Sequence, residues 1–180
     1  MHRLVPINDI DDIPPEYRDT PIGRLLEYHE LERPLDEYKS AALLIGMCMD
    51  HRTSLRIPNH FAYIIRAGGA NLRYSEFKVS YAIGVGGVRH IALMAHTNCG
   101  MSNLMARRED FVEGLVRNAG WGREQAEEHF MQFAPMFEVG NPIDFVLGEA
   151  KRLRTRYPEV TVAPLLYRVE DDRLQLITEA

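Results

Sequence analysis

The sequence predicts an α/β protein with a mostly parallel central β-sheet flanked by helices. Three short, continuously apolar runs, at residues 41–47, 61–65 and 90–95, are typical of parallel strands buried on both faces. Stretches with helical periodicity follow the second and third runs, and strands that alternate with helices imply right-handed crossovers in a layered sheet. At 180 residues with 46% apolar residues, the chain has the size and composition of one domain with one core. We therefore expect residues 1–180 to form a single domain.

Composition excludes several classes of function. The formal net charge is −5, from 21 basic and 26 acidic residues, which disfavours a nucleic-acid or anionic-lipid partner. No apolar run approaches the roughly 18 residues that span a bilayer, so we expect no membrane partner. The first residues carry several acids and have no hydrophobic signal region, which favours a cytoplasmic protein.

The N-terminal region predicts an arm and one helix. Residues 1–19 are polar and contain a Pro-Pro pair, so we expect an irregular arm. Thr20-Pro21 has the pattern of an N-cap followed by proline at the first helical position, and the helix should end near Pro34. Its apolar side chains, Ile22, Leu25, Leu26 and Leu31, need a surface to cover, either on the same domain or on a partner subunit.

Four further helices and a terminal pair of strands complete the prediction. Ser75 can cap a helix that carries Phe77, Tyr81, Ala82 and Val85 and stops at Gly86-Gly87. Helical patterns also cover about 102–118 and 124–133. Asn141-Pro142 opens another helix that runs to about Arg156. The tail, residues 160–177, has the pattern of two strands joined at Asp171-Asp172.

The three apolar strands end in polar or glycine-rich segments at 48–52, 66–71 and 96–100. In open α/β sheets the ligand crevice lies outside the carboxyl ends of the strands. We therefore expect these segments to meet, with Cys48 close to His96 and Cys99. Two thiolates and one imidazole suit Zn²⁺ and leave a fourth tetrahedral position open, as catalytic zinc sites do. The alternative is that both cysteines are buried and inert.

These motifs carry a family resemblance. Cys48-x-Asp50-x-Arg52, followed by His96-x-x-Cys99-Gly100-Met101, resembles the β-class carbonic anhydrases, in their short microbial branch, which includes related COS and CS2 hydrolases. The resemblance implies that Cys48, His96 and Cys99 bind Zn²⁺ and that Asp50 and Arg52 form a dyad beside it. It also implies that family's fold and a homodimer, or a tetramer of dimers, in which residues 1–36 pack on the partner subunit.

The implied activity is reversible hydration of carbon dioxide to bicarbonate and a proton by zinc-bound hydroxide. Asp50 would accept the hydroxide's hydrogen bond and so aim its lone pair, and Arg52 would hold Asp50 ionised. Gly68 and Gly69 would offer CO2 a backbone donor, unless they form a plain turn. The alternatives are a carbonyl sulfide or carbon disulfide hydrolase with the same zinc site, and a non-catalytic bicarbonate- or metal-binding homologue.

Two positions depart from the family pattern. Asn98 stands where the family usually has Asp, and Arg66-Ala67-Gly68-Gly69 replaces the usual Arg-Asn-Ala-Gly. Both departures spare the expected zinc ligands and the dyad, so they bear on substrate preference.

Overall fold

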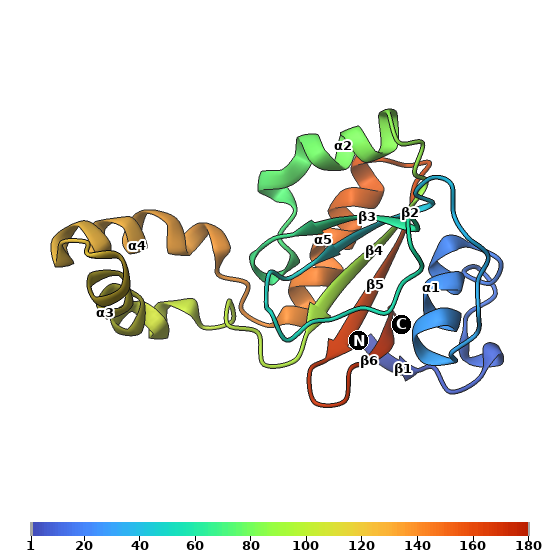
Figure 1. Cartoon of the computed structure of the whole chain (residues 1–180), viewed down its shortest axis with the longest axis horizontal. Helices are drawn as coiled ribbons and strands as arrows, with labels where there is room; N and C mark the ends of the chain where they lie inside the picture. The colour runs from blue at the N-terminus through green and yellow to red at the C-terminus, as the bar shows by residue number, and fades with distance from the viewer. Residues whose placement is uncertain (1, 180) are drawn as a thin grey trace.

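The computed structural model describes residues 2–179 and contains one six-stranded sheet, in the order β1-β6-β5-β4-β2-β3 (Figure 1). The strands are β1 (His2–Pro6), β2 (Leu43–Met47), β3 (Ala62–Arg66), β4 (His90–His96), β5 (Thr161–Arg168) and β6 (Arg173–Glu179). The helices are α1 (Pro21–Glu30), α2 (Glu76–Gly84), α3 (Arg108–Ala119), α4 (Arg123–Phe137) and α5 (Pro142–Arg156). The predicted α/β class is confirmed.

The sheet is mostly parallel because four adjacent strands, β3, β2, β4 and β5, run in one direction. β6 folds back antiparallel on β5 through the predicted Asp171-Asp172 turn. Every residue of β2 is buried, and β4 is buried from its second residue onward, as continuous apolar runs predict. β3 differs from the expectation: it is an edge strand, and Tyr63 and Ile64 are exposed.

Helices cover both faces of the sheet. On one face, Ile22, Leu25 and Leu26 of α1 are fully buried in a cluster with side chains of β2, β4, β5 and β6. On the other face, α2 and α5 pack on the alternate side chains of the same strands. Because the four parallel strands are held between these layers, their carboxyl ends are fixed relative to one another.

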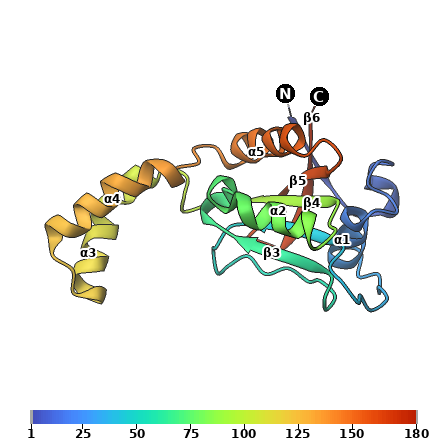
Figure 2. The same ribbon diagram turned by 90° about the horizontal axis from the view of Figure 1, so that it is seen from above.

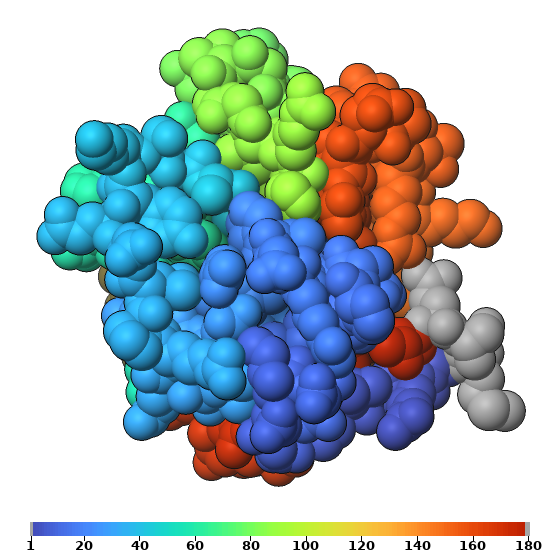
Figure 3. Space-filling model, turned by 90° about the vertical axis from the view of Figure 1, so that its right-hand side faces the viewer, coloured from blue at the N-terminus to red at the C-terminus, as the bar shows by residue number. Residues whose placement is uncertain are grey.

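The N-terminal region is more ordered than its sequence predicts. Residues 2–6 form β1, which pairs antiparallel with β6, so part of the expected irregular arm is a strand. Of the two surfaces that the apolar side of α1 could cover, the partner subunit implied by the resemblance and the protein's own domain, the structure shows it on the protein's own sheet. Figure 3 shows the N-terminal segments spread over this end of the molecule.

The predicted helix starts are partly confirmed. Thr20 Oγ1 accepts hydrogen bonds from the backbone N–H groups of residues 22 and 23, and Asn141 Oδ1 accepts those of residues 143 and 144. Ser75 makes no such side-chain cap. α2 also turns its apolar side outward: Val79 and Ala82 are buried, whereas Phe77 is 81% exposed.

α3 and α4 form a hairpin that extends away from the body of the molecule (Figures 1 and 2). Its two ends meet at the body, where the N–H of Val139 donates to the carbonyl of Met101 at 3.1 Å. Aromatic side chains hold the two helices together, among them Phe111 and Phe130, whose ring centroids are 5.1 Å apart. Within residues 2–179, no helix combines the length and apolarity that a membrane crossing requires.

Candidate metal centre

The three expected ligands come from two neighbouring strands. Cys48 directly follows β2, His96 is the last residue of β4, and Cys99 lies in the turn after β4. β2 and β4 are hydrogen-bonded parallel neighbours, so their carboxyl ends lie side by side. Topology thus brings together residues that are 48 positions apart in the sequence.

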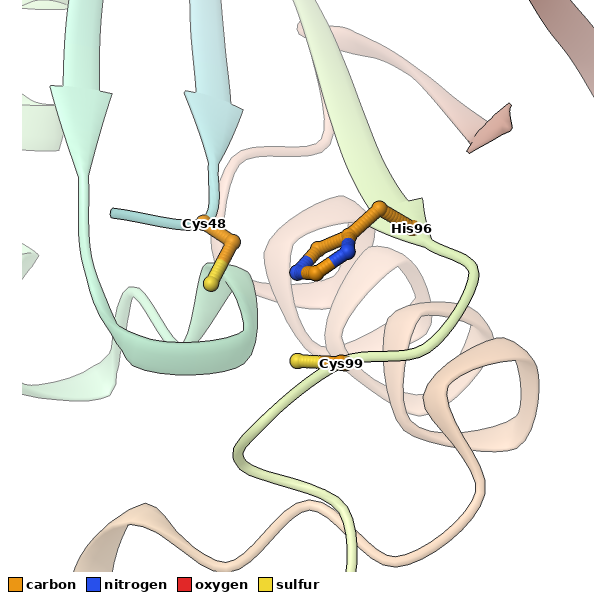
Figure 4. Close-up of side chains that lie close together, drawn as sticks. All are labelled: Cys48, His96 and Cys99. Atoms are coloured by element: carbon orange, nitrogen blue, oxygen red, sulfur yellow. The ribbon is translucent and has the colours of Figure 1, made fainter. Parts of the chain in front are cut away.

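The Cys48 and Cys99 sulfurs and one imidazole nitrogen of His96 all lie within 4.8 Å of one another. All three residues are buried, and Figure 4 shows their tips pointing into one space. A tetrahedral zinc ion with ligands at about 2.0–2.3 Å requires donor atoms at this kind of separation. Both cysteines are free thiols rather than a disulfide.

The hydrogen bonding of His96 fixes which nitrogen is available. Its Nδ1 lies 2.9 Å from the carbonyl oxygen of Thr97, and because a carbonyl only accepts, Nδ1 carries the proton. In the neutral ring, Nε2 then bears a free lone pair. This Nε2 is buried and has no hydrogen-bond partner within the part of the chain that the structure describes. A buried lone pair aimed at two thiols is what a metal ligand presents, so the residues present fit zinc.

The two thiols differ in acidity, and Cys48 is the one that ionises more readily. The hydrogen bond from Cys99 lowers the pKa of Cys48 below its ordinary value. The pKa of Cys99 is raised, first by the same hydrogen bond and then by burial. The backbone N–H of Gly69 also donates to the Cys48 sulfur at 3.3 Å. Gly69 has φ +60, and a Cβ there would collide with Val139, so only glycine allows this approach.

Asp50 and Arg52 form the expected pair beside the ligands. Nε of Arg52 donates to Oδ1 of Asp50 at 3.0 Å, and Nη2 donates to Oδ2 at 2.7 Å, which is a bidentate ion pair. These hydrogen bonds hold the pKa of Asp50 well below its usual range. Oδ2 of Asp50 lies 3.9 Å from Nε2 of His96, so the carboxylate borders the space between the ligands.

Arg66, at the end of β3, is a positioning residue that the sequence analysis did not assign. Its guanidinium donates to the carbonyl of Cys48 at 3.0 Å, and to the hydroxyl and the carbonyl of Thr53, both at 2.9 Å. It therefore ties both ends of the loop that carries Asp50 and Arg52. The pairing of β2 with β3 could have indicated this role, because Arg66 lies opposite Met47, the residue before Cys48.

An apolar pocket of about 270 Å³ adjoins the centre. Met49, Gly68 and Met101 line it on the side of the metal ligands. Phenylalanines of α3 and α4, including Phe133, line the opposite side. Gly68 thus borders this pocket, whereas the N–H of Gly69 is committed to the Cys48 sulfur rather than to a substrate.

Solved structures that this chain is similar to include β-carbonic anhydrases and a related hydrolase. A β-carbonic anhydrase of Trichomonas vaginalis superimposes with a TM-score of 0.62 at 19% identity, over 81% of this chain and 88% of that chain. A carbonic anhydrase of Streptococcus mutans gives 0.59 at 17% identity, over 92% and 100%. A carbon disulfide hydrolase gives 0.54 at 22% identity, over 88% and 89%. No family model and no curated protein matches the sequence. The chain therefore has the fold of these enzymes, as the motif resemblance predicts.

Proposed function

We propose that this protein is a zinc enzyme that reversibly hydrates carbon dioxide to bicarbonate and a proton. The observation that carries the proposal is the buried Nε2 of His96, which has no hydrogen-bond partner among residues 2–179 and lies 3.9 Å from the carboxylate of Asp50, on a ring whose nitrogen is within 4.8 Å of both sulfurs. Cys48, His96 and Cys99 would hold the ion. When bound, zinc lowers the pKa of a coordinated water to about 7 and so supplies a nucleophile near neutral pH.

The other residues have orienting roles in this proposal. Asp50 accepts a hydrogen bond from the nucleophile and so directs a lone pair at the carbon of the substrate. Arg52 already engages both oxygens of Asp50, which keeps the carboxylate ionised and fixes its orientation. Arg66 fixes the loop through the Cys48 and Thr53 carbonyls. With both oxygens held by Arg52, Asp50 would not compete with water for a bound ion.

The surroundings suit an uncharged substrate. Carbon dioxide is linear and has no net charge, so apolar walls and one backbone donor suffice to hold it. Met49, Gly68 and Met101 supply such walls next to the ligands, and we assign the donor role to the backbone at Gly68. Free thiols as ligands are compatible with a reducing compartment, which supports the cytoplasm as the site of action.

The apolar pocket also favours a second candidate, a hydrolase of carbonyl sulfide or carbon disulfide that uses the same residues. Both molecules are larger and more polarizable than carbon dioxide because sulfur replaces oxygen, and an apolar pocket of about 270 Å³ with phenylalanine walls suits them. One of the structures with this fold is a carbon disulfide hydrolase.

The test is a stopped-flow pH-indicator assay of CO2 hydration on zinc-loaded protein, together with headspace loss of COS and CS2. We expect CO2 hydration that disappears on chelation of the metal and returns with zinc. Loss of COS or CS2 without CO2 hydration would select the second candidate. Tight zinc binding without turnover of any of the three gases would indicate a non-catalytic bicarbonate- or metal-binding protein.

A further inference from the structure

A carboxylate from the β5–β6 turn holds the segment that carries Cys99. Glu170 accepts a hydrogen bond from the Thr97 hydroxyl on Oε2, at 2.8 Å, and one from the Asn98 side-chain amide on Oε1, at 2.9 Å. The Thr97 hydroxyl in turn accepts the N–H of Val169 at 3.0 Å. Both residues before Cys99 are thus bound through their side chains to one acid 72 or 73 positions further along the chain.

The bound segment also supports the Asp50–Arg52 pair. Asn98 has φ +54, so its backbone is left-handed, and its carbonyl accepts the Nη2 of Arg52 at 2.8 Å. The same Nη2 donates to Oδ2 of Asp50. A shift of Asn98 would therefore move a metal ligand on one side and withdraw an acceptor from Arg52 on the other.

Glu170 explains why residue 98 is an asparagine rather than an aspartate. Asparagine and aspartate both tolerate a left-handed backbone, so the φ angle does not choose between them. The neighbour does: the carboxylate of Glu170 can only accept, so position 98 must donate. An aspartate there, the residue that the family resemblance leads one to expect, would place two carboxylates at hydrogen-bond distance and repel Glu170.

We infer that Glu170 is a positioning residue of the metal centre, and that it requires an amide at position 98 to set Cys99 and Arg52. The inference rests on the proposed zinc site. The hydrogen bonds that Glu170 accepts also lower its pKa, and the one from the Thr97 hydroxyl contributes most. The carboxylate is therefore ionised at neutral pH.

Reversal of the hydrogen bond tests the inference. Asn98→Asp should weaken zinc binding by about tenfold, the lower end of the range for residues that orient metal ligands. In the double variant Asn98→Asp with Glu170→Gln, the donor and the acceptor exchange places: the amide at position 170 donates to the carboxylate at position 98. The amide oxygen at position 170 still accepts the Thr97 hydroxyl. We expect this double variant to recover most of the zinc affinity. Glu170→Gln alone should have a smaller effect than Asn98→Asp.

Zinc affinity is measured by competition with a chromogenic chelator, and thermal unfolding of the metal-free variants checks that each folds. Asp171→Asn is the matched control: Asp171 lies in the same turn but pairs with Arg168 at 3.2 Å, and its change should leave zinc affinity unaltered. Zinc binding by Asn98→Asp equal to wild type, or a double variant no better than Asn98→Asp, would overturn the inference.

The readout separates this inference from the proposed activity. If the affinity pattern holds but no variant hydrates CO2, the positioning role of Glu170 stands and the proposed activity fails. If the wild-type protein hydrates CO2 but zinc affinity does not depend on which residues occupy positions 98 and 170, the proposed activity stands and the positioning role of Glu170 fails.

Discussion

Asp50 borders the candidate metal centre, but it is not one of the three expected ligands. Both of its oxygens accept hydrogen bonds from the Arg52 guanidinium, and Oδ1 also accepts the backbone N–H of Arg52 at 3.0 Å. To become a ligand, the carboxylate would have to give up this bidentate pair. Its task in the proposed reaction is therefore orientation, and metal retention should not depend on it.

Asp50→Ala should accordingly keep its zinc and lose activity. We expect kcat/KM for CO2 to fall by at least about 100-fold, a usual cost of removing a positioned acid–base group. Zinc content by elemental analysis and stopped-flow kinetics measure the two effects separately. Asp110→Ala, which removes an exposed carboxylate of α3, is the control. Loss of zinc from Asp50→Ala would identify Asp50 as a true ligand.

Arg66 is the second residue whose role can be measured. Arg66→Ala removes the donors to the Cys48 and Thr53 carbonyls, and it should lower the free energy of unfolding by about 1–3 kcal/mol. Because the loop between those carbonyls carries Asp50 and Arg52, kcat for CO2 hydration should fall as well. Chemical denaturation and kinetics check both effects, with Arg117→Ala on α3 as the control. An unchanged kcat would restrict Arg66 to stability.

At this scale the sequence predicted the residues that form compact motifs. Cys48, Asp50 and Arg52 are spaced by two, and His96 and Cys99 by three, at the ends of recognisable strands. Arg66 and Glu170 belong to no such motif, since they act on loops distant in sequence through hydrogen bonds. Only the register of β3 and the turn between β5 and β6 bring them to the site.

Among the elements, α1 is fastened to the sheet by one buried acid. The side chain of Glu30 is fully buried and forms an ion pair with Arg173 of β6. It also accepts the N–H of Leu174 at 2.6 Å, and Nδ1 of His29 lies 2.9 Å away. Burial alone would raise the pKa of Glu30, but these hydrogen bonds outweigh it and lower the pKa.

The lowered pKa predicts how stability depends on pH. A carboxyl group whose pKa is lower in the folded state contributes stability above its unfolded pKa, and that contribution disappears as the pH falls through the folded value. Glu30→Gln should therefore be less stable than wild type at pH 7, and the difference should shrink below about pH 4.5, the ordinary value for glutamate. Urea titrations at pH 7 and pH 3.5 compare the two proteins. A difference that does not vary with pH would contradict the assignment.

The predicted strands were clearest where both faces are buried. β2 and β4 are buried on both faces, so their apolar runs were unambiguous. β1 was missed because its five residues, His-Arg-Leu-Val-Pro, lie at the sheet edge and are exposed or half-buried. For α2 the sequence predicted the helix but not which side is buried, because its larger apolar residues, Phe77 and Tyr81, lie on the outward face.

The outward face of α2 bears on how whole molecules associate. Phe77 of α2 and Val85, which directly follows that helix, are 81% and 70% exposed, and both are large apolar side chains. Tyr63 of β3 lies against Gly86 at the end of the same helix, so the apolar surface continues onto the edge strand. α1 is already covered by its own sheet, and therefore a second copy would have to use a different surface. A continuous apolar surface that includes a free strand edge is typical of an interface between subunits.

We therefore predict a homodimer formed through α2 and β3. Light scattering should give about 41 kDa, twice the 20.7 kDa of one chain, or a multiple of it if dimers associate further. Phe77→Glu should dissociate the dimer without unfolding the chain, because the side chain is exposed in the single subunit and a buried charge would oppose association. Met131→Glu, at an exposed apolar position of α4, should leave the mass unchanged. A wild-type mass of 20.7 kDa would refute the dimer. A dimer that survives Phe77→Glu would instead place the interface elsewhere, since two opposed carboxylates at this position cannot both be buried at low cost.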